Sequence, residues 1–315
     1  MYLKLSKRSS VNGKIAYNLI MNAIVILVRN DYRDIMDLNE CFKSIQKAIP
    51  ETLLDCEIVI FHEGGFSKYK DEIVIPNEPF PKVVFSEVSL DVPQEIAERF
   101  GSRILEYYPH PTHGNGPLGF GHPGFTLGYR SMCRFFSAQI FSTEIVRRKE
   151  YVYLMRLDTD SRFLEGNGCS LFSWAESNNV SYSYIKSAVQ WDNFKMIKFF
   201  KLTSLRYFGS LGFNFFLKAL CVPRGKVYYT NFEICKVEFF ASKQWQSFFH
   251  KIDATGGFYL HRWGDHIFRF MGAHVLLEKK QRLPIPAGFV YEHGGTFRSE
   301  DRASIRPHWM SKTKV

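Results

Sequence analysis

The sequence predicts an α/β fold built on a mostly parallel sheet. Three observations predict it: a β-branched strand at residues 22–30, a helical pattern directly after it, and a second apolar strand from Cys56 to Phe61. Strand, helix and strand within about 40 residues form a βαβ unit, whose two strands are parallel. Of the 315 residues, 45% are apolar and 23% are charged, which is typical of a soluble globular protein.

The elements follow from the pattern in chain order. The first strand, "NAIVILVRN", has the β-branched composition of a buried central strand. The helix after it places apolar residues at helical spacing, and these are Ile35, Leu38, Phe42, Ile45 and Ile49. A further helix is predicted from Leu127 to Val146, followed by the strand "YVYLMRL" at 151–157. Without a repeat or a linker, we expect a polar tail at 1–21, one domain at 22–300 and a tail at 301–315.

Charge and composition limit the partners. The formal net charge is +10, but the basic residues are spread along the chain, so no nucleic acid is expected and a small anionic ligand is favoured. The stretch 194–220 mixes Phe with Lys and Arg. It is open to two interpretations, an amphipathic helix packed on the domain, which base rates favour, and peripheral contact with an anionic membrane surface. The six cysteines form no CxxC pair, which disfavours a zinc knuckle.

The N-terminal region carries no evident signal peptide or membrane span. The apolar run "IAYNLIMNAIVILV" is shorter than the ~20 residues that cross a bilayer. We therefore expect a soluble or cytoplasmic protein, or a Golgi-type catalytic domain lacking its anchor. Residues 107–124 read as a long loop with three histidines, His110, His113 and His122, and no element there fixes the spacing that a metal site requires.

Two aspartates follow directly after the strand at 151–157. Ligands of open α/β sheets bind beyond the carboxyl ends of the strands, where Asp158 and Asp160 stand. Side chains at i and i+2 of an extended segment point the same way, and two carboxylates repel unless a cation neutralises them. A hard divalent ion would do so and would also bind substrate phosphates. The pattern is typical of metal-dependent nucleotide-sugar transferases, although Asp-x-Asp by itself is more often a solvated turn.

Several further segments strengthen that interpretation. They are "LVRN" at 27–30, "GYRSMCRFFS" at 128–137, "YVYLMRLDTDSRF" at 151–163, "YYTNFEI" at 228–234, "GGFYLHRWGDHI" at 256–267 and "VYEH" at 290–293. In this order they resemble the fungal α-1,2-mannosyltransferase family, glycosyltransferase family 15. The resemblance implies a GT-A fold, a single nucleotide-binding α/β domain with a mixed, mostly parallel sheet and flanking helices. It also implies a retaining enzyme that transfers mannose from GDP-mannose to a glycan hydroxyl in α-linkage, with Mn²⁺ or another divalent cation.

The resemblance assigns roles to individual residues. The metal would be held by Asp158, which stands where the family has a glutamate, by Asp160 and by His293. Glu233 is the candidate nucleophile, or the stabiliser of an oxocarbenium-like state. Asp265 is a second catalytic candidate, which would bind a sugar hydroxyl or the acceptor. The residues expected to contact the donor are Tyr129, Arg130, Arg134, Arg29 and Glu63.

Departures from the family pattern leave alternatives open. The family's membrane anchor and stem have no counterpart here, and "HEGGF" at 62–66 differs from the family's Asn-Asp-Glu-Pro-Phe-like segment. The alternatives are a GT-A transferase of another nucleotide sugar, a degenerate transferase that binds sugar without turnover, and a non-catalytic basic protein that binds glycan or nucleic acid. The expected partners are a nucleotide sugar and a glycan acceptor, and the sequence does not predict the oligomeric state.

Overall fold

The computed structural model describes residues 21–107, 126–189 and 194–294, and five short strands besides. Those strands are β1 (Leu5–Lys7), β2 (Tyr17–Leu19), β6 (Gly114–Asn115), β7 (Pro123–Gly124) and β16 (Phe297–Arg298). β1 pairs with β2 and β6 with β7, both antiparallel. The three histidines of the predicted loop lie outside the described residues, as do most of the predicted tails.

A mixed seven-stranded sheet forms the centre of the molecule, in the order β14-β10-β13-β8-β3-β4-β5. Its strands are β3 (Asn22–Val28), β4 (Cys56–His62), β5 (Val83–Glu87), β8 (Tyr153–Leu157), β10 (Tyr182–Tyr184), β13 (Phe232–Lys236) and β14 (Arg282–Pro284). β3 pairs in parallel with β4 and with β8, and β4 with β5, whereas β13 runs antiparallel to β8 and β10. The predicted βαβ unit and the mixed, mostly parallel sheet are confirmed.

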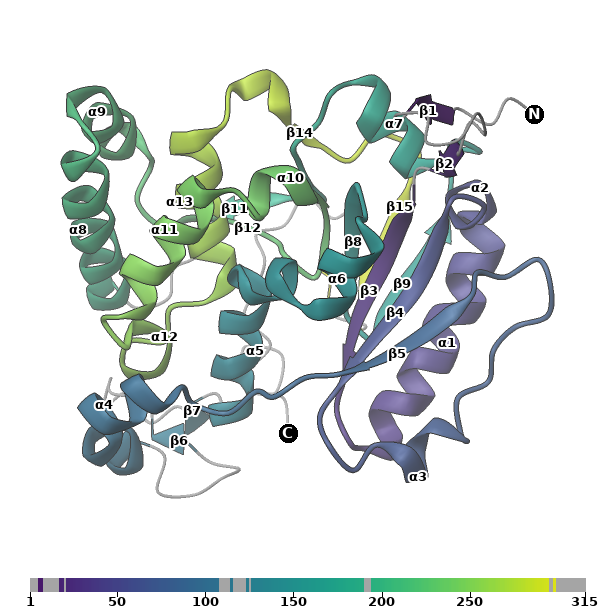
Figure 1. Ribbon diagram of the computed structural model, residues 1–315, viewed down its shortest axis with the longest axis horizontal. Coiled ribbons are helices and arrows are strands. Elements are labelled where there is room, and N and C mark those ends of the chain that lie inside the picture. Colours follow the sequence, from purple (N-terminus) through teal and green to yellow (C-terminus); the bar gives the residue numbers. More distant parts are fainter. Residues whose placement is uncertain are drawn as a thin grey trace, which may run out of the picture.

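Helices cover both faces of the sheet (Figure 1). Alternate residues of β3 face opposite sides, so that Ile24 and Ile26 pack against α1 (Tyr32–Ala48) while Ala23 and Val25 face the other helices. The remaining helices are α2 (Pro50–Leu53), α3 (Ser67–Lys70), α4 (Gln94–Tyr107), α5 (Leu127–Ser137), α6 (Glu144–Lys149), α7 (Leu171–Ser177), α8 (Phe194–Ser210), α9 (Phe213–Cys221), α10 (Val237–Phe240), α11 (Lys243–Asp253), α12 (Gly257–Leu260) and α13 (Asp265–Leu276). Two 3₁₀ turns, η1 (Gln139–Ser142) and η2 (Lys279–Gln281), complete the described helical elements.

The single helix predicted from Leu127 to Val146 is wrong. The chain forms α5, then η1, then α6, with a break at Ala138, where φ is −160°. The cause lies in distant side chains, because the Trp245 indole N–H and the Arg269 guanidinium donate to the Ser137 carbonyl. The Ser137 carbonyl therefore accepts from these distant side chains. A continuing helix would instead require it to accept from the amide four residues later in the chain.

The stretch 194–220 forms two helices, α8 and α9, joined at Leu211 and Gly212. Gly212 has φ +127°, in the region that side chains rarely adopt, so the helix cannot continue through it. The two helices pack against each other, and α9 also packs on α13. Of the helices in the described part of the chain, none has the length and apolarity to cross a membrane.

The sheet directs several polar segments to one edge. β3, β4, β5 and β8 are mutually parallel, so their carboxyl ends meet there. A second, smaller sheet consists of β9 (Ser161–Glu165), which follows β8 in the chain, β15 (Val290–His293) and β16. β15 pairs with β9 in antiparallel register, which places His293 opposite Ser161. A further pair, β11 (Ser187–Val189) and β12 (Lys226–Tyr228), is antiparallel.

Candidate active site

Three predicted metal residues meet at the carboxyl edge of the sheet. The Nε2 atom of His293 lies 2.9 Å from Oδ1 of Asp160 and 3.5 Å from Oδ2 of Asp158. We call Asp158, Asp160 and His293 the carboxylate–histidine cluster. All three side chains are partly exposed, so one side of the cluster is accessible to a ligand.

Backbone hydrogen bonds fix the turn that presents the two aspartates. The Asp158 N–H donates to Ser161 Oγ over 3.1 Å, and the Ser161 N–H donates to the Asp158 carbonyl over 3.1 Å. The Gly294 N–H donates to the Asp160 carbonyl over 3.2 Å, which ties the end of β15 to the same turn. The cluster therefore depends on the pairing of β9 with β15 as much as on the end of β8.

Contacts within the cluster shift the pKa values of His293 and Asp160. Burial lowers the pKa of His293, but its hydrogen bonds to Asp158 and Asp160 outweigh burial and raise that pKa to about 9. Burial likewise opposes the charged form of Asp160, yet the imidazolium of His293 lowers its pKa below the ordinary value. Tyr229 Oη lies 3.2 Å from Nδ1 of His293 and orients the ring.

The donor set of the cluster fits a divalent cation. Two carboxylates and one imidazole suit a borderline ion such as Mn²⁺, which accepts both oxygen and nitrogen ligands. In the described part of the chain, no three His, Cys, Asp or Glu side chains already surround a metal-binding point. Here His293 contacts the carboxylates directly, so a bound cation would separate them and take over the neutralisation that the imidazolium provides.

Arg156 connects the cluster to the interior of the protein. Its Nε donates to Asp158 Oδ1 over 3.1 Å, and its Nη1 donates to Asp265 Oδ2. Its guanidinium also stacks 3.7 Å from the ring centroid of Phe136. Burial opposes the charge on Asp265, but Arg156 and His266 hold the pKa of that carboxyl well below its usual range. The predicted residues Asp158 and Asp265 are thus joined through one buried cation.

Glu233 lies beside Arg156 on the neighbouring strand and is fully buried. The two residues are direct cross-strand partners in the pairing of β13 with β8. Both carboxylate oxygens of Glu233 accept from Arg269, at 3.0 Å from Nε and 2.8 Å from Nη2. Glu233 and Arg269 each expose 1% of their side chains. In this arrangement, Glu233 is a charge-compensated internal carboxylate.

Arg29 and Glu63 follow the ends of β3 and β4. Arg29 is 73% exposed, and its Nε lies 3.1 Å from both carboxylate oxygens of Asp34. The hydrogen bond to Asp34 raises the pKa of Arg29 despite partial burial, and the charge of Asp160 adds to that rise. Arg29 therefore lies within electrostatic reach of the cluster. Burial and the charge of Asp91 raise the pKa of Glu63, which no described contact joins to the cluster.

The three predicted donor residues of α5 lie in different surroundings. Arg134 forms a buried bidentate ion pair with Asp253, with both N–O distances 2.7 Å. Arg130 is buried and its Nη1 donates to the Phe258 carbonyl over 3.5 Å. Burial raises the pKa of Tyr129 well above its usual value, and the charge of Asp265 adds to it. Tyr129 therefore lies near the Arg156–Asp265 pair, while the described contacts of Arg134 hold α5 to α11.

Comparison with known proteins identifies the family. Residues 124–308, more than half of the chain, match the profile of the glycolipid 2-alpha-mannosyltransferases. The chain belongs to the glycolipid 2-alpha-mannosyltransferase family. The matched residues include the carboxylate–histidine cluster, Glu233 and Asp265.

Curated relatives are similar over part of their length. The probable mannosyltransferase KTR3 of Saccharomyces cerevisiae is 29% identical over 168 residues, covering 50% of this chain and 40% of that protein. Glycolipid 2-alpha-mannosyltransferase 1 of Candida albicans is 27% identical over 171 residues, covering 50% of this chain and 38% of that protein. The chain thus spans half or less of the length of these family members.

Two solved structures of fungal proteins share the fold. Core-mannan synthase A (CmsA/Ktr4) from Aspergillus fumigatus, in its Mn/GDP form, superposes with a TM-score of 0.70 at 17% identity, covering 96% of this chain and 80% of that one. The mannosyltransferase Ktr4p from S. cerevisiae, in complex with GDP, gives 0.68 at 19% identity, covering 87% and 71%. The expected fold is confirmed.

Two arginines of the site were missed from the sequence. Arg156 and Arg269 neutralise Asp158, Asp265 and Glu233, but neither received a role from its motif. The available signal was a single arginine within the buried apolar strand at 151–157, because a buried charge requires a partner. Arg269 lies 36 residues from Glu233, so no local spacing connects them.

Proposed function

We propose that this chain transfers mannose from GDP-mannose to a hydroxyl of a glycan acceptor in α-linkage. The observation that carries the proposal is the convergence of Asp158, Asp160 and His293 at the carboxyl edge of the parallel strands. In open α/β sheets that edge is where ligands bind. Membership of the mannosyltransferase family, and two neighbours of the same fold solved with GDP, support this donor.

The cluster would hold the divalent cation, with Asp158 and Asp160 supplying oxygens and His293 a nitrogen. Once bound, such a cation supplies positive charge that stabilises a departing diphosphate. The exposed Arg29, fixed by Asp34, adds a second positive charge at the same edge. Arg156 positions Asp158 by a hydrogen bond and holds Asp265 ionised.

Glu233 is the proposed carboxylate for the sugar carbon, either as nucleophile or as stabiliser of positive charge. Its bidentate pair with the buried Arg269 occupies both carboxylate oxygens, which favours the charge-stabilising role over direct attack. An attack through one oxygen would require the Arg269 hydrogen bond on that oxygen to be exchanged. Retention of configuration is part of the proposal, and the anomeric configuration of the product measures it.

A donor screen tests this function. The purified chain is incubated with Mn²⁺, an α-mannoside acceptor and, in separate reactions, GDP-mannose, UDP-sugars or CMP-sugars. We expect release of GDP only, and a product whose new anomeric centre has the one-bond C1–H1 coupling of an α-mannoside by NMR. Release of UDP without GDP would assign the fold to another donor, and release of no nucleotide by any donor would overturn the transferase proposal.

A further inference from the structure

The α8–α9 hairpin exposes a large apolar surface. Among the described residues, six of the thirteen exposed large hydrophobic side chains belong to the segment from Phe199 to Leu220. On α9 they recur at i, i+4 and i+7 as Phe213, Leu217 and Leu220, which places them on one helix face. Phe213 is 71% exposed and Leu220 is 50% exposed. Exposed apolar patches of this kind mark interaction sites.

The same hairpin has only one sign of charge. Between Asp192 and Glu233 the sequence contains seven basic residues and no acidic one. Of the six whose side chains the structure describes, five are exposed, and these are Lys198, Arg206, Lys218, Arg224 and Lys226. Apolar side chains interleaved with cations therefore cover a surface that would attract an anionic partner.

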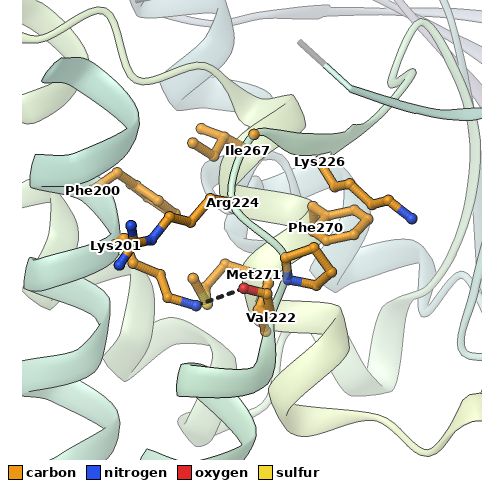
Figure 2. Close-up of a pocket in the computed structure, with 10 residues that line it drawn as sticks. Phe200, Lys201, Val222, Arg224, Lys226, Ile267, Phe270 and Met271 are labelled. Atoms are coloured by element: carbon orange, nitrogen blue, oxygen red, sulfur yellow. Dashed lines mark hydrogen bonds between the residues drawn. The ribbon is translucent and has the colours of Figure 1, made fainter. Parts of the chain in front are cut away.

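The inner side of the hairpin is firmly packed. The Lys201 amine donates to the carbonyls of Ala219, Leu220 and Val222 at the end of α9. Figure 2 shows the bond to Val222 beside a cavity of about 10 Å³, too small for a ligand. Phe208 packs against Phe248 of α11, with ring centroids 4.8 Å apart. The exposed side chains thus belong to a helix pair that is already fixed on the domain.

A basic groove adjoins the turn of the hairpin. It has a volume of about 710 Å³ and lies between the end of α8 and α11. Its lining combines Ser210 and Leu211 with three basic side chains of α11, which are Lys243, His250 and Lys251. These basic side chains could neutralise a phosphate group bound beside the hairpin. In Figure 1 the hairpin forms the side of the molecule opposite α1.

We propose that the α8–α9 hairpin docks this protein on an anionic lipid surface. Phe213, Leu217 and Leu220 enter the boundary between headgroups and acyl chains, while the surrounding lysines and arginines contact lipid phosphates. A lipid surface fits better than a protein partner because protein–protein interfaces are depleted in lysine. Lysine stems, in contrast, lie along an apolar surface and reach outward to headgroups.

Vesicle sedimentation without any nucleotide sugar tests the charge part of the proposal. The protein should bind vesicles of equal parts phosphatidylcholine and phosphatidylserine, and binding should fall with added salt. The triple variant K198Q/R206Q/K218Q should bind about 100-fold more weakly, because each Lys or Arg near an anionic surface contributes about fivefold to the affinity and three such factors multiply to about 100. The matched control K47Q/K82Q/R147Q removes the same charges elsewhere and should bind like the wild type.

Apolar substitutions test the insertion part. F213S/L217S should weaken binding to the same vesicles by about 10-fold or more. The control M36S/L54S removes side chains that are 70% and 71% exposed, on α1 and directly after α2, and it should have no effect. Both helices lie on the side of the molecule away from the hairpin in Figure 1. All these positions are exposed, and circular dichroism verifies that each variant is folded.

Several results would overturn the proposal. Equal binding to pure phosphatidylcholine would contradict the anionic surface, and no binding to either vesicle would contradict docking altogether. A concentration-dependent dimer seen by light scattering, and lost in F213S/L217S, would assign the hairpin to self-association instead. Because no donor is present, these outcomes leave the transferase proposal untouched, and a negative donor screen would leave this one standing.

Discussion

Replacement of Glu233 by glutamine separates its structural contribution from its proposed chemistry. The side chain keeps its shape but loses the charge that neutralises Arg269. Both partners are 1% exposed, and two hydrogen bonds of 3.0 and 2.8 Å join them. Arg269 would keep its bonds to the carbonyls of Phe136 and Ser137 and its place over the Phe240 ring, 4.5 Å from the centroid.

The expected cost follows from the burial of this pair. Removal of one partner of a buried ion pair leaves an uncompensated charge, and this typically destabilises a protein by about 3–5 kcal/mol. The remaining carbonyl and aromatic contacts of Arg269 place the estimate near the lower end, at about 3 kcal/mol. The double variant E233L/R269M removes both charges, and we expect it to recover part of that loss, because the carbonyls of Phe136 and Ser137 also lose their Arg269 donor.

Urea unfolding followed by circular dichroism measures both variants against the wild type. Glu233→Gln should lower the midpoint without a change in the slope. A free energy of unfolding within about 1 kcal/mol of the wild type would refute the assignment of Glu233 as the buried partner of Arg269. If Glu233→Gln left stability unchanged but abolished sugar transfer, Glu233 would act in the reaction and would not contribute to stability.

Acid and packing predictions follow from the same structure. Because Arg156 and His266 hold the pKa of Asp265 low, Asp265 stabilises the fold above about pH 4, and this contribution is lost as pH falls further. Asp265→Asn should therefore flatten the acid side of the stability–pH curve measured by thermal melting. Lys201→Met removes the donor to three carbonyls at the end of α9, which should cost about 1–3 kcal/mol and speed hydrogen exchange in the hairpin.

The controls for these two variants are exposed residues of the same kind. Asp71→Asn should keep the acid slope of the wild type, since Asp71 is exposed. An unchanged acid slope in Asp265→Asn would contradict the role of Arg156 as its partner. Lys47→Met should leave exchange in the hairpin as it is, and equal exchange in Lys201→Met would show that the amine does not hold α9.

The elements that the sequence predicts best are those with local signals. The βαβ unit follows from apolar spacing in β3, α1 and β4, and each of these is found close to its expected bounds. The convergence of Asp158 and Asp160 follows from their position after a strand. Its completion by His293 came from the family resemblance, since the residue lies on β15, more than 130 positions along the chain from Asp160.

The contacts that the sequence does not predict share a physical cause, which is side-chain contact across long separations. The break after α5 occurs because Trp245 and Arg269 donate to the Ser137 carbonyl at its end, from 108 and 132 residues away. The ion pair of Arg134 with Asp253 likewise joins residues 119 positions apart. A periodicity argument detects which face of a helix is buried, and it cannot detect which distant charge will meet that face.

Calorimetric titration of GDP, with and without Mn²⁺, tests the carboxylate–histidine cluster most directly. The wild type should bind GDP more tightly with Mn²⁺, and Asp160→Asn should weaken that binding by at least about 10-fold, because even groups that only orient metal ligands contribute 10–100-fold. The control Asp55→Asn lies before β4, at the opposite edge of the sheet, and should bind like the wild type. If Asp160→Asn kept the full effect of Mn²⁺ on GDP binding, the cluster would not be the cation site.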